Sequence, residues 1–185
     1  MWKEKVQTLV KELAPRERDI VMRRYALDGS SGNHKIQWRG KELVVREETL
    51  ASIGASFHIT RERVRQLEVS IAKKMKEVLS ANRTLFAPLY DAATVRLQEL
   101  GGACEENSFI KTLTGLDSAR FQEWRPNDLA ERESVRFVLT HAFPEQVERI
   151  AGSASFYPVW KKTATSWSDV QDMLENIKNV LVHAG

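Results

Sequence analysis

The residues best placed to make specific contacts lie in a run from Thr60 to Lys76, with the sequence TRERVRQLEVSIAKKMK. Apolar residues recur there at spacings of three and four, which predicts a helix over 61–79 with that face turned inward. Thr60 is a preferred N-cap residue. The outward face of the first two turns then carries a compact polar set: Arg61, Glu62, Arg65 and Gln66.

These side chains have the chemistry needed to read base edges in a major groove. Arginine can donate twice to guanine, glutamine can pair with adenine, and glutamate can accept a hydrogen bond from cytosine. Arg61 with Arg65, and Glu62 with Gln66, are neighbours at a spacing of four. Because phosphates would repel Glu62, a base-reading role explains it better than a backbone contact. A solvated charged face is the common alternative, and the pattern alone leaves both interpretations open.

A short helix should precede this one. Thr49 opens a segment in which Leu50, Ile53 and Phe57 are apolar. Gly54 is poor for helix propensity and is explained if another helix crosses close by. Two helices joined by a turn of three or four residues predict a helix-turn-helix unit. Two further helices are expected upstream, over 2–13 and from Pro15 to about 26.

The stretch from about 30 to 47 interrupts the helical pattern. Ile36 and Trp38 alternate with polar residues before Arg39-Gly40, which predicts a β-hairpin. The segment is rich in basic residues that either contact a DNA backbone or decorate a solvated hairpin: His34, Lys35, Arg39, Lys41 and Arg46.

Charge is divided unevenly along the 185 residues. Residues 1–84 hold 18 Lys and Arg against 11 Asp and Glu, whereas residues 85–185 hold 10 against 14. The first half therefore suits a polyanionic partner and the second does not. No apolar run approaches the roughly 20 residues that a membrane helix needs, so we expect a cytoplasmic protein. Cys104 is the single cysteine of the sequence, so no disulfide within the chain is expected.

The motif residues closely resemble region 4 of the primary bacterial sigma factors. The likeness runs over about residues 5–79 and rests on Leu13-Ala-Pro-Arg-Glu-Arg18 and on Thr60-Arg-Glu-Arg-Val-Arg-Gln66. It implies that the helix starting at Thr60 enters the major groove of a −35 promoter element, and that region 4 docks on the flap of the RNA polymerase β subunit. The implied contacts with bases and backbone are Arg61, Glu62, Arg65 and Gln66, with Thr49, Leu50, Arg63 and Lys73 at phosphates.

Two features depart from this family. Ala14 stands where the family usually has a Ser or Thr N-cap, which should cost about 1 kcal/mol. The insertion at about 30–47 is longer than the family's connection. The sigma regions that recognise and melt the −10 element have no counterpart here, so the chain by itself should not be a complete initiation factor.

A domain boundary is expected near 82–86, which gives a sigma region 4-like domain over 1–82 and a second domain over 86–185. Helices are predicted over 89–100, 105–113, 116–124 and 132–140, then a turn over 146–150, a strand over 156–161 and a final helix capped by Ser168. This order resembles a winged helix, and more distantly one of the HARE type. The excess of acidic over basic residues in this half favours a protein partner over a second tight contact with DNA.

The sequence offers little support for catalysis. His34, His58, His141 and His183 lack metal-ligand spacing, and no glycine-rich phosphate loop occurs. We expect no catalytic residues, metal or cofactor. The predicted fold is mainly α, and the predicted function is a DNA-binding transcription factor acting on double-stranded, promoter-like DNA. The alternatives are an adaptor that docks on RNA polymerase core or a regulator, and the DNA-targeting part of a larger effector.

Overall fold

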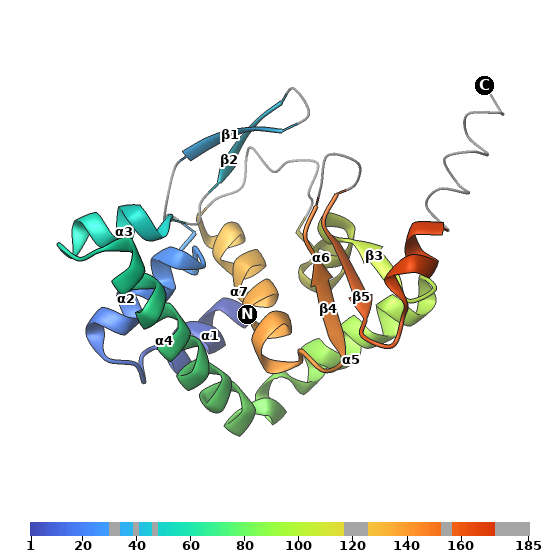
Figure 1. Cartoon of the computed structure of the whole chain (residues 1–185). Helices are drawn as coiled ribbons and strands as arrows, with labels where there is room; N and C mark the ends of the chain where they lie inside the picture. The colour runs from blue at the N-terminus through green and yellow to red at the C-terminus, as the bar shows by residue number, and fades with distance from the viewer. Residues whose placement is uncertain (30–33, 39–40, 46–47, 117–125, 153–156, 173–185) are drawn as a thin grey trace.

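The structure is a computed structural model that describes residues 1–29, 34–38, 41–45, 48–116, 126–152 and 157–172. It is mainly α-helical, as predicted (Figure 1). The elements of the first half are α1 (Trp2–Val10), α2 (Pro15–Arg24), β1 (His34–Trp38), β2 (Lys41–Val45), α3 (Leu50–Ser56) and α4 (Arg61–Ala81). Those of the second half are α5 (Arg83–Glu99), β3 (Ala103–Glu105), α6 (Glu106–Thr114), α7 (Pro126–Ala142), β4 (Val147–Ile150) and β5 (Val159–Lys162).

The start of α2 compensates for the missing cap at Ala14. Pro15 occupies the first helical position, where its lack of an N–H costs nothing. The Glu17 carboxylate accepts the backbone N–H of Ala14 at 3.4 Å, which supplies half of a capping box. Glu17 also forms an ion pair with Lys74 of α4. The Glu17 side chain, from within the helix, therefore replaces part of the stabilisation that the hydroxyl of a Ser or Thr N-cap would provide.

The predicted hairpin is present in the insertion. Strands β1 and β2 pair antiparallel, with Ile36 opposite Leu43 and Trp38 opposite Lys41. The hairpin lies above α2 and α3 in the view of Figure 1. Residues 30–33, 39–40 and 46–47 of the insertion lie outside the described residues.

The second half has the topology of a winged helix. Its elements follow the order helix, strand, helix, helix, strand, strand, and its sheet has the order β3-β5-β4 with antiparallel pairing throughout. Trp160 at the middle of β5 lies opposite Cys104 on one side and Arg149 on the other. The first strand of the module thus joins the hairpin formed by the last two, as in winged helices.

Several predicted boundaries in this half were wrong. Residues 147–150 form strand β4 instead of a turn, because β5 supplies a pairing partner that the local pattern does not reveal. The final helical segment already begins at Trp167, so Ser168 lies within it and Ser166 precedes it. The helix expected over 116–124 falls almost wholly outside the described residues.

The hydrophobic core runs through both halves. Helix α4 ends at Ala81 and α5 begins at Arg83, so the predicted domain boundary falls at the junction between these helices. Helix α7 packs against α1 and α4 as well as against its own half, and in Figure 1 it lies between these two helices and strands β4 and β5. The buried cluster contains residues of both halves, among them Val6, Leu79, Phe137 and Trp160.

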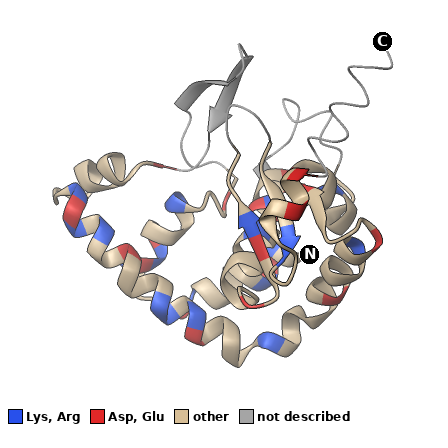
Figure 2. Cartoon of the chain, turned by 45° about the vertical axis from the view of Figure 1, so that its right-hand side comes forward, with Lys and Arg blue, Asp and Glu red and all other residues tan. Residues whose placement is uncertain are grey.

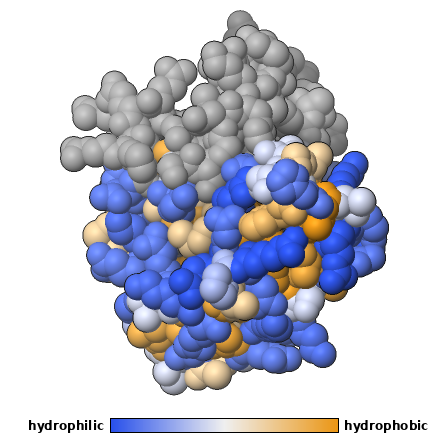
Figure 3. Space-filling model, turned by 90° about the vertical axis from the view of Figure 1, so that its left-hand side faces the viewer, coloured by the Kyte–Doolittle hydropathy of each residue, from blue (hydrophilic) through white to orange (hydrophobic). Residues whose placement is uncertain are grey.

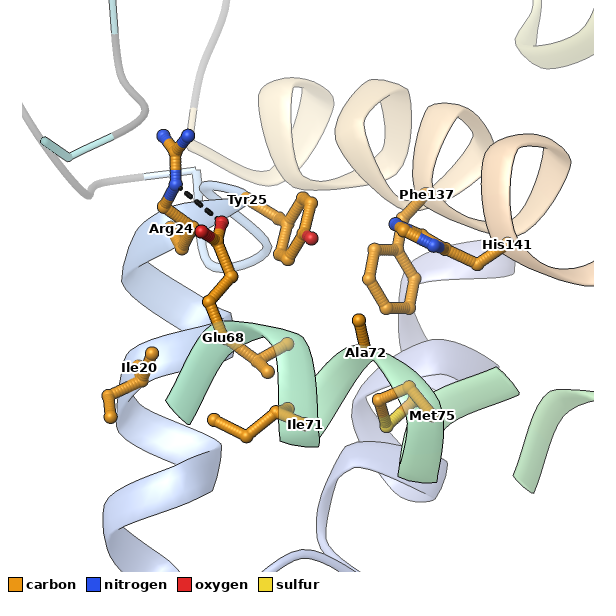
Figure 4. Close-up of a pocket in the computed structure, with 10 residues that line it drawn as sticks. Ile20, Arg24, Tyr25, Glu68, Ile71, Ala72, Met75, Phe137 and His141 are labelled. Carbon is orange, nitrogen blue, oxygen red and sulfur yellow. Dashed lines mark hydrogen bonds and ion pairs between the residues drawn. The ribbon is translucent and has the colours of Figure 1, made fainter. Parts of the chain in front are cut away.

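The contact between α7 and the first half is partly aromatic and partly polar. Phe137 and His141 of α7 lie on Tyr25, the residue that ends α2, with ring centroids 4.9 and 5.4 Å away. Figure 4 shows these rings gathered opposite Ile71 and Met75 of α4, around a small cavity of about 10 Å³. At the start of α7, Glu131 accepts the backbone N–H groups of Trp2 and Lys3 at 2.8 and 2.9 Å. Because these are unpaired donors of the first turn of α1, a side chain of the second half caps a helix of the first.

His141 makes the stability of this contact depend on pH. Burial lowers its pKa to about 4, below the value of about 6.5 expected in the unfolded chain. The unfolded state therefore binds a proton more readily than the folded state. The contribution of His141 to the free energy of unfolding should be fully present above pH 6.5 and should fall as the pH drops towards 4. The loss attributable to His141 is at most about 3 kcal/mol, and urea unfolding at stepped pH would measure it.

The variant His141→Phe should lose this part of the pH dependence, since phenylalanine does not titrate. The matched control is His58→Asn, at an exposed position with φ of 53°, a conformation that asparagine tolerates. An unchanged stability profile between pH 6.5 and 4 in His141→Phe would contradict the assignment.

Candidate nucleic-acid interface

The turn between α3 and α4 is fixed by backbone contacts around Gly54. The backbone N–H of Ile59 donates to the carbonyl of Gly54 at 3.0 Å, and His58 between the helices adopts a positive φ. A Cβ atom at Gly54 would lie 2.8 Å from the carbonyl oxygen of Ile59. The sequence predicted a crossing helix at Gly54, but the backbone that comes closest is the turn leading into α4.

Both helices of the unit begin with a threonine cap, as the sequence predicted. The hydroxyl of Thr49 accepts the N–H of Ser52, and the hydroxyl of Thr60 accepts the N–H of Arg63, each at 3.1 Å. These bonds satisfy one unpaired donor at each helix start. They also fix where the first turn of α4 begins and hence which side chains point outward.

The structure places all four predicted base-reading side chains on the exposed surface. Arg61, Glu62, Arg65 and Gln66 are exposed, while Val64 and Ile71 are buried in the core. Basic and acidic residues follow one another along this helix (Figure 2). Figure 3 shows that the side of the molecule on which α3 lies is mostly hydrophilic, with apolar patches between the charged residues.

Two of these side chains are joined to each other. Arg65 donates from Nε and Nη2 to the two carboxylate oxygens of Glu62 at 2.9 and 2.8 Å, and Arg63 donates to Gln66 Oε1 at 3.1 Å. The hydrogen bond from Arg65 lowers the pKa of Glu62, so this carboxylate is ionised at neutral pH. An exposed ion pair of this kind contributes only about 0–1 kcal/mol, so a ligand can rearrange it at little cost.

The predicted phosphate contacts lie around this set. Thr49 is exposed at the start of α3, whereas Leu50 is half-buried and packs on the core, so only its backbone is suited to a polar contact. Arg63 and Lys73 are exposed on α4. The insertion's basic residues His34, Lys35 and Lys41 lie on the hairpin strands, while Arg39 and Arg46 fall outside the described residues.

Ion pairs from α2 hold the two helices in place, and sequence reasoning missed them. Arg23 donates to both carboxylate oxygens of Glu48 at 3.0 and 2.7 Å, and Glu48 accepts the hydroxyl of Ser52 on α3. Arg24 donates to Glu68 of α4 at 2.8 Å, the dashed contact in Figure 4. The partners are 25 and 44 residues apart along the chain, so no local spacing signals them.

Other kinds of site find no support in the part of the chain that the structure describes. No group of three or more His, Cys, Asp or Glu side chains there is arranged to hold a metal ion. Among the same residues, no helix combines the length and apolar character needed to cross a bilayer.

Comparison with known proteins finds a family that the segment around the interface resembles. Residues 9–77 match the family model of sigma-70, region 4. The RNA polymerase sigma factor SigA of Nostoc sp. is 34% identical over 74 residues, which are 40% of this chain and 15% of that protein. SigA of Microcystis aeruginosa is also 34% identical over 74 residues, 40% of this chain and 14% of that protein, and SigA of Clostridium acetobutylicum is 30% identical over 76 residues, 41% and 16%.

These matches cover the first half of the chain and about a seventh of the length of each relative. No solved structure matches. The predicted likeness to sigma region 4 is thus confirmed, and it supports a DNA-binding role in transcription. The likeness of the second half to HARE-type modules stays a prediction.

The variant Gly54→Ala tests the geometry of the turn. The added Cβ would press on the backbone oxygen of Ile59, and overpacking of this kind costs about 1–3 kcal/mol. That cost should exceed the gain of about 1 kcal/mol from better helix propensity. We expect a net loss of about 1–2 kcal/mol in the free energy of unfolding by urea.

The control is Ala55→Ser at the next, exposed position, which should change stability by less than about 0.5 kcal/mol. A Gly54→Ala variant more stable than the parent would show that the turn can move aside.

Proposed function

Residues 9–77 of the chain are a sigma-70 region 4, and from this we propose that the protein is a sequence-specific transcription factor that reads a −35-like promoter element. The observation that carries the proposal is the exposed polar face on the first two turns of α4. Arg61 and Arg65 there have the donors for guanine, and Gln66 has the donor and acceptor for adenine.

Glu62 gives this face its specificity. A bare carboxylate near DNA is repelled by phosphates, but one opposite a cytosine amino group accepts a hydrogen bond. Its ion pair with Arg65 orients both side chains in the free protein. On binding, the Arg65 guanidinium and the Glu62 carboxylate replace their weak ion pair by contacts with adjacent base pairs. Little side-chain conformational entropy is lost, because both side chains are already oriented.

Phosphate contacts set the register of the helix in the groove. We assign this role to Arg63 and Lys73 on α4 and to Thr49 and the backbone of Leu50 at the start of α3. Unpaired N–H groups at helix starts favour anions, and Thr49 stands at the start of α3 as Thr60 does at the start of α4.

RNA polymerase core is a second proposed partner, on the resemblance to sigma factors. The inward residues of the upstream helices, among them Val6, Leu9 and Ile20, are buried in the core that α7 completes. A polymerase contact therefore uses the outer surface of this module or displaces α7. For this reason we favour base reading over the adaptor that only docks on polymerase or a regulator, and over the targeting part of an effector.

The second half acts in this proposal as a support and a docking module. Its α7 is the third helix of a winged helix, the helix that such modules commonly insert into a groove. Here its residues from Ala130 to Leu139 are almost all buried. The acidic balance of this half fits a protein partner better than DNA.

Binding to two duplexes tests the base-reading role. The chain should bind a duplex carrying a −35-like element more tightly than a scrambled duplex of the same composition. Arg65→Ala should cost about 1–3 kcal/mol on the specific duplex and relax its preference, because it removes a base contact. Fluorescence anisotropy at several salt concentrations measures both quantities.

Lys73→Ala is the matched control on the same helix. Losing a phosphate contact should weaken both duplexes alike and reduce the slope of log affinity against log salt by about one. Equal binding of the two duplexes by the parent chain at physiological salt would refute base reading.

A further inference from the structure

Val69 of α4 is an exposed apolar side chain on the polar face that is proposed to read bases. It is 60% exposed, and among the large apolar residues that the structure describes only Met1, at 65%, is more exposed. Valine is β-branched and forms helices less readily than alanine, and no burial compensates for this at position 69. Neither helix propensity nor core packing therefore explains a valine here.

The geometry of the helix places Val69 on the same side as the base-reading residues. Successive residues of an α-helix are about 100° apart, so Val69 lies one turn beyond Arg65 and Gln66 and two turns beyond Glu62. Ile71, by contrast, projects from the opposite side of α4 and lines the small cavity towards α2 and α7 (Figure 4). A duplex that contacts Arg65 and Gln66 therefore also meets Val69.

The surroundings of Val69 are polar, which favours DNA over a protein as its contact. The residues three and four positions away are Arg65, Gln66, Ala72 and Lys73, and the one apolar member of this set, Ala72, is half-buried. A protein-docking surface normally brings several exposed apolar residues together. A single apolar side chain among hydrogen-bonding ones instead matches the major groove, where the methyl group of thymine lies among donors and acceptors.

We propose that Val69 contacts the 5-methyl group of a thymine in the major groove, next to the base pairs that Arg65 and Gln66 read. The inference rests on the base-reading function proposed above and adds to it a specificity-determining residue of a different chemistry. Val69 is about 6 Å further along the axis of α4 than Arg65, which is the rise of roughly two stacked base pairs. It lies before Lys73, to which a phosphate contact is assigned, so DNA is bound on both sides of it along the helix.

The contact distinguishes thymine from cytosine by burial of apolar surface. Cytosine has a hydrogen atom where thymine has the methyl group, so the valine side chain would lose part of its contact. Loss of one buried methyl group should weaken binding by about fourfold. Since no phosphate is involved, the slope of log affinity against log salt should stay unchanged.

Deoxyuridine in place of thymidine tests the contact, because uracil keeps the hydrogen-bonding groups of thymine and lacks only the 5-methyl group. Each thymine of the −35-like duplex is replaced singly, and binding is measured by fluorescence anisotropy. One replacement should weaken binding by the parent chain about fourfold, and the same replacement should make no difference to Val69→Ala. At that position, 5-methylcytosine should bind the parent more tightly than cytosine does, and this difference too should vanish in the variant.

Val95→Ala is the matched control, since Val95 is 57% exposed on α5. It should bind like the parent and keep the difference between thymine and uracil. Both variants replace an exposed valine of a helix by a better helix former, so neither should unfold the chain.

The outcomes separate this inference from the function on which it rests. A parent chain that prefers the −35-like duplex to the scrambled one, yet binds every uracil duplex as tightly as the thymine duplex, would overturn the role of Val69 alone. So would a Val69→Ala variant that keeps the full penalty for uracil. Equal binding of the −35-like and scrambled duplexes would overturn base reading, and the thymine contact with it.

Discussion

The packing of α7 against α1 and α4 is the constraint on which the rest of the structure depends. Glu131 of α7 caps the start of α1, and Phe137 lies against Tyr25 at the end of α2. Without α7, the apolar faces of α1 and α4 would be left partly uncovered. With it in place, α4 is buried along Ile71, Met75 and Leu79, and its opposite face at the N-terminal end stays accessible. The same contact that joins the two halves therefore determines which side of α4 meets a partner.

The accessible face is held in place by helix caps, a close-packed turn and ion pairs to α2. Threonine caps start α3 and α4, Gly54 lets the turn lie close to α3, and Arg23 and Arg24 tie both helices to α2. The polar side chains are thus presented on a rigid support, with Glu62 and Arg65 already oriented by each other. Such an arrangement reduces the side-chain conformational entropy that is lost when a complex forms, which favours discrimination between base pairs.

Local patterns predicted the parts of the fold that local forces determine. The helix over 61–79, its threonine cap, the hairpin in the insertion and the helix near 105–113 all follow from spacing and cap chemistry. What failed depends on distant partners. Strand β4 exists because β5 pairs with it, and α5 begins earlier than predicted, so that Phe86 is already buried within it. For the site, the exposed residues on α4 were predictable, whereas the ion pairs beneath them and the burial of α7 were not. Those features join residues that no window of sequence brings together.

Selection of bound duplexes from a random pool tests the central claim most directly, because it asks whether the first turns of α4 read bases at all. The account predicts a short enriched motif in the parent chain, with guanine and adenine preferences that change at a single position when Gln66 is replaced by alanine. If the chain retains DNA but the retained duplexes show no enriched motif, the face contacts only the DNA backbone. That result would contradict the account.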